Sequence, residues 1–286
     1  MTAIKSILFP FDFSPACCRL IAPVRTLAAR FGASVTALTV APPPWTPPSA
    51  DMPPLIGETP EEWTHTLQAR LDERLATAFT GLSTTCIADA GDPAIRIAAF
   101  ANTHPVDLIM MPTHGLGTFR TVVIGSVTAK VLHDVHCAVW TSAHTTEHPP
   151  TELPRRILCA VDGGPQTPAV LQGTAHLAQR IGAGLSLIHV VEPITDWPGF
   201  AHDREVQEQM REAAKSKLEG LRRAAAVDAP VRIAVGKIVD TVVEEARQDG
   251  AELIVVGRGA ISEPFGRLRT HAFGIVQRAP CPVLSL

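Results

Sequence analysis

The chain has 286 residues, of which 46% are hydrophobic and 19% charged, so it fits a soluble globular protein with buried cores and exceeds one typical domain of about 100–200 residues. Its formal net charge of −3 favours neither nucleic acid nor an anionic membrane as a partner. No apolar run approaches the roughly 18–20 residues that span a bilayer, and Pro10 and Asp12 break the apolar start as in a first strand rather than a signal peptide. We therefore expect a cytoplasmic protein that binds neither membranes nor nucleic acid.

The first half of the chain alternates short apolar runs with segments of helical spacing. Residues 15–31 have this spacing and stop at Gly32, a residue type that commonly ends helices. Asp92-Pro93 supplies a capping side chain and a proline at the first position of another helix. A long amphipathic helix is expected near 60–80. The expected strands are KSILFPF (5–11), SVTALTV (34–40), TTCIADA (84–90), VDLIMM (106–111) and CAVWTS (137–142).

The segment 41–60, between the second strand and the long helix, is too rich in proline for regular structure. We expect it to run as an extended flap. Two interpretations remain open: a lid over the ends of the strands, or a loop that covers the surface or docks a partner.

The second half of the chain repeats the first. A shift of 150 residues places Asp12 on Asp162, and a shift of 145 residues places DLIMM (107–111) on ELIVV (252–256). The corresponding strands of the second half are RRILCAV, GLSLIHV, APVRIAV, AELIVV and CPVLSL, with a long helix expected near 202–226. Two homologous domains explain this pattern.

The polar, proline-rich segment 142–154 has the composition of an exposed linker, so we place one domain at 1–145 and the other at 154–286. Strands that alternate with helices and carry continuous apolar runs predict parallel sheets covered on both faces. The predicted fold class is α/β: two tandem doubly wound, Rossmann-like domains, each a five-stranded parallel sheet of order 3-2-1-4-5. In this order a ligand crevice lies between the carboxyl ends of strands 1 and 4.

A loop with three glycines, PTHGLGTFRTVVIGSV (112–127), follows the fourth strand of the first half. Gly125-Ser126 stands where a helical pattern begins, and the first amides of a helix have no intrahelical acceptor. The helix dipole adds roughly half a positive charge there, so phosphate is the natural guest. Gly115 permits close backbone approach or positive φ.

Two further residues complete the predicted crevice. Asp12, at the end of the first strand, can accept a hydrogen bond from a sugar hydroxyl or an amine, and the backbone at Val40 can contact a base edge. Together with the loop they describe a nucleotide across the strand ends. The loop is not a P-loop, because no G-x-x-x-x-G-K-[ST] occurs, and no glycine follows the first strand as a dinucleotide fingerprint requires.

The pattern G-x-x-G, nine residues, then G-[ST] marks the ATP-binding branch of the universal stress protein family. Gly115, nine residues, then Gly125-Ser126-Val127 resembles its second part, and FPFDFS (9–14) resembles the end of that family's first strand. The resemblance covers nearly the whole chain twice, as in a tandem universal stress protein. The resemblance implies that Asp12 and Val40 face adenine and ribose, with Pro10 and Phe11 beside Asp12. Met111 and Pro112 would line the ribose and phosphate side, and His114 would lie within the loop. The phosphates would be held by Gly115, Gly125, Ser126 and Val127.

The first half departs from the family pattern at two positions. Pro112 replaces the first glycine, and because proline has no N–H, any phosphate bond from that amide is lost. Such a bond to a charged group is worth about 1.5–3 kcal/mol. Phe11 stands where the family often has a small polar residue.

The second half departs further. It keeps Asp162 and Gly257, but Ala260 replaces the loop glycine and Thr270-His271 replace the Gly-Ser pair. We predict that this domain binds nucleotide weakly or not at all.

The resemblance implies ATP, or AMP or ADP, possibly accompanied by Mg²⁺ or Mn²⁺. It also implies dimer contacts through the final strands, CAVWTS and CPVLSL, either in a homodimer or between the two halves of one chain as an internal pseudo-dimer. The protein partner that would respond is not readable from the sequence.

No Ser-His-Asp order, paired-carboxylate motif or metal signature stands out, so we assign no catalytic residue. His133, His136, His144 and His148 straddle a helix end, a strand and the linker, so no shared metal site is expected. We predict a stress-response protein that binds adenine nucleotide as a regulator or sensor. The alternatives are a slow ATPase or phosphotransferase, and a scaffold that binds another small ligand such as a lipid.

Overall fold

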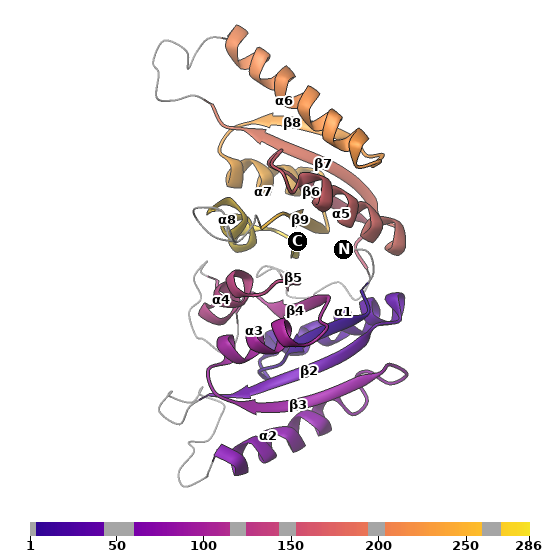
Figure 1. The fold of residues 1–286 in the computed structure, drawn as a ribbon, viewed down its shortest axis with the longest axis vertical. Helices are drawn as coiled ribbons and strands as arrows, with labels where there is room; N and C mark the ends of the chain where they lie inside the picture. The colour runs from indigo at the N-terminus through magenta and orange to yellow at the C-terminus, as the bar shows by residue number, and fades with distance from the viewer. Residues whose placement is uncertain (1–3, 43–59, 115–123, 143–152, 194–203, 259–269) are drawn as a thin grey trace. The chain divides into compact units, whose positions relative to one another are not determined.

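The computed structural model of the chain describes residues 4–42, 60–114, 124–142, 153–193, 204–258 and 270–286 (Figure 1). The chain divides into two compact units, Ala3–Leu153 and Pro154–Leu286. Each unit is an α/β domain with helices on both faces of a parallel sheet, as the sequence predicts.

The first unit has five parallel strands in the order β3-β2-β1-β4-β5. Because parallel crossovers are right-handed, α1 and α2 lie on one face of the sheet and α3 and α4 on the other; α3 packs against α4, and α2 against β2 and β3. The elements are β1 (Ser6–Pro10), α1 (Pro15–Phe31), β2 (Ser34–Ala41), α2 (Pro60–Leu75), β3 (Thr84–Ala90), α3 (Pro93–Thr103), β4 (Leu108–Pro112), α4 (Ser126–Asp134) and β5 (Ala138–Ser142).

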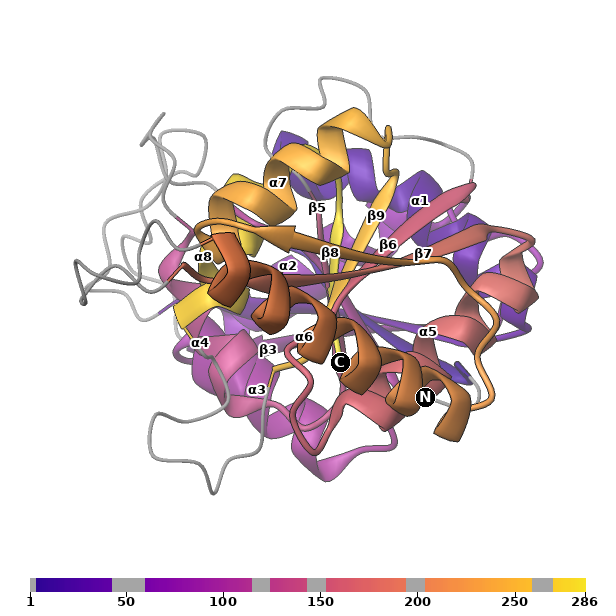
Figure 2. The ribbon, with the colours of Figure 1, turned by 90° about the horizontal axis from the view of Figure 1, so that it is seen from above.

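The second unit repeats this topology, with parallel strands in the order β10-β9-β6-β7-β8. In Figure 2, β7 and β8 lie between α6 and α7, so both faces of this sheet are covered too. The elements are β6 (Arg156–Ala160), α5 (Thr167–Ile181), β7 (Gly184–Val191), α6 (Arg204–Ala224), β8 (Val231–Val235), α7 (Ile238–Gln248), β9 (Leu253–Val256), α8 (Thr270–Arg278) and β10 (Val283–Ser285).

Local sequence signals account for the helix ends. The Asp92 side chain accepts a hydrogen bond from the Ile95 amide at 3.0 Å, with Pro93 at the first helical position, so the predicted cap of α3 is confirmed. Gly32 ends α1 at a left-handed φ of 65°, a conformation that glycine adopts at no steric cost. In the second unit α5 begins at Thr167, whose amide bonds the Gly164 carbonyl in a turn just before the helix.

The sheet core explains the continuous apolar runs. Ile7, Leu8 and Phe9 of β1 are fully buried, and so are Leu253 and Ile254 of β9. Strands covered on both faces need apolar side chains on both. The residues that follow these central strands lie at the carboxyl edge of each sheet. This is the edge where the sequence predicts a ligand crevice.

Candidate functional site

The carboxyl ends of β1 and β4 lie side by side in the first unit. Ile7 pairs with Leu108 and Leu8 with Ile109, so the two strands end at the same edge of the sheet. On the other side of β1, the Phe11 amide donates to the Leu38 carbonyl of β2 at 2.8 Å. The residues that follow β1 are thereby held between the ends of β2 and β4.

The start of α4 is fastened to the end of β4. The Gly125 amide donates to the Thr113 carbonyl at 2.9 Å, and the Thr128 hydroxyl donates to the Pro112 carbonyl at 3.0 Å. Because of these bonds, the segments at Pro10–Asp12, Met111–His114 and Gly125–Val127 meet at one edge. The structure therefore brings together the described residues of the predicted site, which are Pro10, Phe11, Asp12, Val40, Met111, Pro112, His114, Gly125, Ser126 and Val127.

These residues differ in what they can offer a ligand. Ser126 is exposed and Asp12, Val40, His114, Gly125 and Val127 are partly exposed, whereas Pro10, Phe11, Met111 and Pro112 are buried. The four buried residues can shape the floor of a site, but their side chains belong to the core.

Gly125 is required for space rather than for an unusual dihedral. Its φ of −58° is open to any residue, but a Cβ there would lie 3.3 Å from the Thr113 carbonyl oxygen. Its amide is already engaged by that oxygen. The amides in the first turn of α4, from Ser126 onward, are those for which the helix provides no acceptor.

Asp12 shapes the turn that leads from β1 into α1. Its Oδ1 accepts from the Ser14 amide at 2.9 Å, and Ser14 in turn caps α1 by accepting from the Cys17 amide. Between them Phe13 has a φ of 61°, which is an uncommon conformation for a bulky side chain. Local hydrogen bonding therefore fixes the Asp12 carboxylate at the carboxyl edge of the sheet.

Aromatic packing fills the α1–α2 side of this edge. The Phe11 ring is 5.4 Å from that of Phe9 and 5.1 Å from that of Phe13, centroid to centroid. Phe13 packs on a small cluster that includes Trp63, and the Arg70 guanidinium lies over its ring at 5.2 Å. The sequence identified Phe11 as a departure from the family pattern, and the structure shows that this side chain is 2% exposed in the core.

His114 lies where the strand end enters the loop. Burial lowers the pKa of this imidazole, so the neutral form is favoured. Residues 115–123 of the glycine loop, which include Gly115, lie outside the described residues. So do residues 43–59 of the Pro-rich segment and, in the second unit, Ala260.

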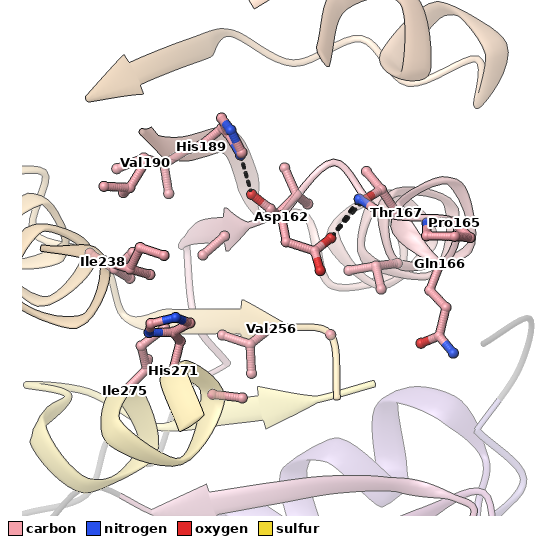
Figure 3. Close-up of a pocket in the computed structure, with 18 residues that line it drawn as sticks. Asp162, Pro165, Gln166, Thr167, His189, Val190, Ile238, Val256, His271 and Ile275 are labelled. Carbon is pink, nitrogen blue, oxygen red and sulfur yellow. Dashed lines mark hydrogen bonds between the residues drawn. The ribbon is translucent and has the colours of Figure 1, made fainter. Parts of the chain in front are cut away.

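The second unit contains a cavity of about 300 Å³ at the corresponding edge of its sheet (Figure 3). Its walls come from the carboxyl ends of β6, β7 and β9 and from α5, α7 and α8. Asp162, His189 and His271 line it, among apolar side chains such as Ile238 and Val256. The sequence predicted weak nucleotide binding or none in this unit and did not predict the cavity. The one signal for it was the smaller residues at the strand ends, Val161 and Gly257.

Within the ranges that the structure describes, no helix is both long and apolar enough to cross a membrane. Nor do the described residues place three or more histidine, cysteine, aspartate or glutamate side chains so that they could hold a metal ion.

Comparison with known proteins identifies a family for both units. The model of the universal stress protein family matches residues 3–142 and again residues 154–286. A curated relative from Thermus aquaticus, universal stress protein in QAH/OAS sulfhydrylase 3'region, is 28% identical over 134 residues, which cover 46% of this chain and 96% of that protein.

Solved structures with the same fold span the whole chain. The crystal structure of a universal stress protein from Archaeoglobus fulgidus DSM 4304 has a TM-score of 0.67 at 21% identity, covering 99% of this chain and 96% of that one. A functionally unknown protein from Pseudomonas aeruginosa PAO1 has a TM-score of 0.64 at 15% identity, covering 100% and 93%. At these identities the likeness shows a shared tandem fold.

Proposed function

The chain belongs to the universal stress protein family, with one family domain in each half, and on this premise we propose that its first domain binds an adenine nucleotide, in the first place ATP. Nucleotide occupancy would set a conformational or assembly state that a partner protein reads, so the chain acts as a regulator or sensor in a stress response. The proposal places this activity in the cytoplasm.

The observation that carries the proposal is the convergence of Asp12 with the start of α4. Asp12 follows β1, and α4 begins 114 residues later in the chain at Ser126, yet the register of β1 with β4 and the two bonds from α4 to β4 hold them at one sheet edge. Such an edge of an open α/β sheet is where ligands bind. A carboxylate and a helix N-terminus at one edge match a molecule with hydroxyl or amine donors at one end and an anion at the other.

The chemistry of ATP fits these groups one by one. The phosphates would accept hydrogen bonds from the first-turn amides of α4 and from the Ser126 hydroxyl, at the positive end of the helix dipole. Asp12 would accept from the ribose hydroxyls or the adenine amine, and the Val40 backbone would meet the base edge. Pro112 has no N–H to donate, and the Gly125 amide already donates to the Thr113 carbonyl. Hydrogen bonds to the phosphates would therefore come from Ser126 and Val127. Any Mg²⁺ or Mn²⁺ would enter with the phosphates.

Binding without turnover is the function we favour, because the sequence contains no recognisable nucleophile–base or paired-carboxylate arrangement. A slow ATPase or phosphotransferase is the alternative. An assay of phosphate release from purified protein that binds ATP decides between them. Binding without any phosphate release would exclude the enzyme and support the regulator. Pairing of the final strands, in a homodimer or within the chain, belongs to the same proposal, and sedimentation of the chain with and without ATP tests it.

Calorimetric titration of the full chain with ATP tests the site itself. Asp12→Asn should lower ATP affinity about tenfold or more, since a hydrogen bond to a charged group is worth about 1.5–3 kcal/mol. Ser126→Ala should lower it by a smaller factor, because the backbone amides remain. Asp162→Asn is the matched control at the corresponding position of the second unit and should leave ATP affinity unchanged. Unchanged affinity in both first-unit variants would show that the nucleotide binds elsewhere.

A further inference from the structure

Small side chains at the strand ends line the cavity of the second unit. With the 150-residue shift Val161 corresponds to Phe11, and with the 145-residue shift Val256 and Gly257 correspond to Met111 and Pro112. At each of the three positions the second unit has the smaller residue. The space of about 300 Å³ is at the lower end of the range for small-molecule pockets and equals about ten water volumes.

The Val170 side chain lies close to Gly257, on the wall of the cavity. A Cβ built on Gly257 would lie 3.1 Å from Cγ2 of Val170, which lines the cavity from α5. A larger residue here would therefore press into the cavity wall. The absence of a side chain at this position preserves the space between β9 and α5.

Two polar side chains of the lining, His189 and Asp162, present hydrogen-bond acceptors. The carbonyl of Val161 can only accept, so His189, whose Nδ1 lies 2.8 Å from that oxygen, donates through Nδ1 and in its neutral form keeps Nε2 as an acceptor. Asp162 is a carboxylate on the rim, where its Oδ1 accepts from the Gly164 amide at 2.8 Å and from the Thr167 hydroxyl at 3.2 Å. Figure 3 shows His189 and Asp162 around the same space, with His271 on the side of α8.

The sequence at this edge also departs from that of the first unit. Thr270-His271 stand where the first unit has Gly125-Ser126, and Ala260 stands where it has Gly115. The positions proposed to hold phosphates in the first unit are therefore changed in the second. An apolar molecule with a hydrogen-bond donor instead satisfies the apolar walls and the acceptors together.

From size, apolarity and the acceptor character of the lining, we infer that the second domain binds a small, largely apolar molecule with a hydrogen-bond donor at one end, an amine or a hydroxyl, and not a nucleotide. The two halves of the chain are then two sensors that share a fold and respond to different chemical classes. This inference is independent of ATP binding by the first unit.

Three compounds that share one indole ring test the inference on the full chain: tryptamine, tryptophol and indole-3-acetate. They carry an amine, a hydroxyl and a carboxylate on nearly the same frame. By calorimetry or saturation-transfer NMR we expect tryptamine to bind most tightly, tryptophol next, and indole-3-acetate at least tenfold more weakly than tryptamine. ATP added in excess should not displace tryptamine.

Variants that install the first unit's residues locate the binding. Val161→Phe places the larger aromatic ring in the cavity and should lower tryptamine affinity at least tenfold. His189→Thr installs the residue found at Thr39 and removes the acceptor without filling space, so it tests the same site if the first variant folds poorly. Asp12→Asn, in the first unit, should leave tryptamine affinity unchanged.

Several outcomes overturn the inference. Displacement of tryptamine by ATP would make the cavity a nucleotide site, and indole-3-acetate binding as tight as that of tryptamine would refute the acceptor argument. Tryptamine affinity that is equal in the parent chain, Val161→Phe and His189→Thr would place the binding elsewhere. Absence of binding by all three compounds would show that the cavity does not take this class of ligand.

Discussion

At the end of the first strand, the two units place the same aspartate in the same turn but surround it differently. Oδ1 of Asp12 accepts from the amide two residues later at 2.9 Å, and Oδ1 of Asp162 does so at 2.8 Å. Phe13 and Gly163, which follow them, share a left-handed φ of 61° and 72°. Next to this common turn, Phe11 is buried in the first unit, whereas Val161 lines a cavity in the second.

The difference teaches that the fold and the ligand depend on separate residues. Buried strands, helix caps and the aspartate turn recur in both halves and build the same sheet edge. The side chains at the strand ends differ: Phe11 packs among aromatic rings in the first unit, whereas Val161 lines a cavity in the second. Substitutions at matched positions in the two units therefore test this difference, because each unit serves as the reference for the other.

The largest effect is expected from exchanging the strand-end residues. Phe11→Val removes a side chain that is 2% exposed and packed against two rings, and should destabilise the first unit by about 2–4 kcal/mol. Val161→Phe has a cavity to occupy and should cost about 1 kcal/mol or less. Hydrogen exchange of the full chain in urea, resolved by peptide, measures each unit separately; equal losses in the two variants would contradict the comparison.

The next largest effect is expected at the matched glycines that follow the third strand of each unit, where alanine should cost more stability in the second unit. Gly91 and Gly236 have φ values of 134° and 156°, but a Cβ on Gly236 would lie 2.5 Å from Thr241 Oγ1, whereas one on Gly91 would meet the flexible Arg96 side chain at 3.3 Å. We expect Gly236→Ala to cost about 3 kcal/mol and Gly91→Ala about 1–2 kcal/mol.

The clash at Gly236 can be tested separately from the backbone strain. In the double variant Gly236→Ala/Thr241→Ala the contact is removed, so thermal unfolding should recover much of the difference, with Thr241→Ala alone as the control. No recovery would assign the whole cost to the dihedral angle.

The bond between α4 and β4 should have a smaller effect that is confined to the first unit. The buried Thr128 hydroxyl donates to the Pro112 carbonyl at 3.0 Å, and the corresponding residue of the second unit is Phe273, which has no hydroxyl. Thr128→Val keeps the volume but leaves that carbonyl without this donor, at a cost of about 1–2 kcal/mol. Faster amide exchange in α4 than in the Thr128→Ser control is the expected signature; identical exchange would contradict it.

The smallest effect concerns pH. In the first unit Arg96 donates to both carboxylate oxygens of Asp89, at 2.6 and 2.8 Å; the second unit has Ala234 and Thr241 at these positions. Burial acts to raise the pKa of Asp89, but the bonds from Arg96 and from the Ala90 amide outweigh it and lower the pKa below its ordinary value. The pair is largely exposed, so it contributes about 1 kcal/mol at most.

Because the folded-state pKa of Asp89 is lowered, its contribution is present above the unfolded-state pKa of about 3.9 and is lost as the pH falls through the lowered value. Asp89→Asn should therefore be slightly less stable than the parent chain in urea at pH 7, and the gap should close at acid pH. A stability difference between the parent chain and Asp89→Asn that grows as the pH falls would contradict this prediction.

Much of this architecture follows from sequence because it depends on short-range signals. The strand runs, the Gly32 helix end and the Asp92 cap are local, and the internal repeat transfers each inference from one half to the other. The convergence of Asp12 with the carboxyl end of β4 was predictable from strand order alone.

The cavity and the bonding of Gly125 were not predictable in this way. Whether Val161, Val256 and the helices leave a space depends on packing distances between segments roughly a hundred residues apart, which no local pattern encodes. In the same way, the sequence favoured the Gly125 amide as a phosphate donor, but that amide bonds the Thr113 carbonyl across a loop. Both findings concern tertiary packing rather than propensity.

Hydrogen exchange of the full chain with ATP and with tryptamine, added separately, tests the division of labour most directly. We expect ATP to slow exchange in the first-unit peptides around residues 11–16 and 124–131 and to leave their second-unit counterparts unchanged. Tryptamine should slow exchange around residues 161–167 and 270–276 alone. Protection of both units by ATP, or of the second unit by ATP alone, would contradict the claim that the two domains recognise different chemical classes.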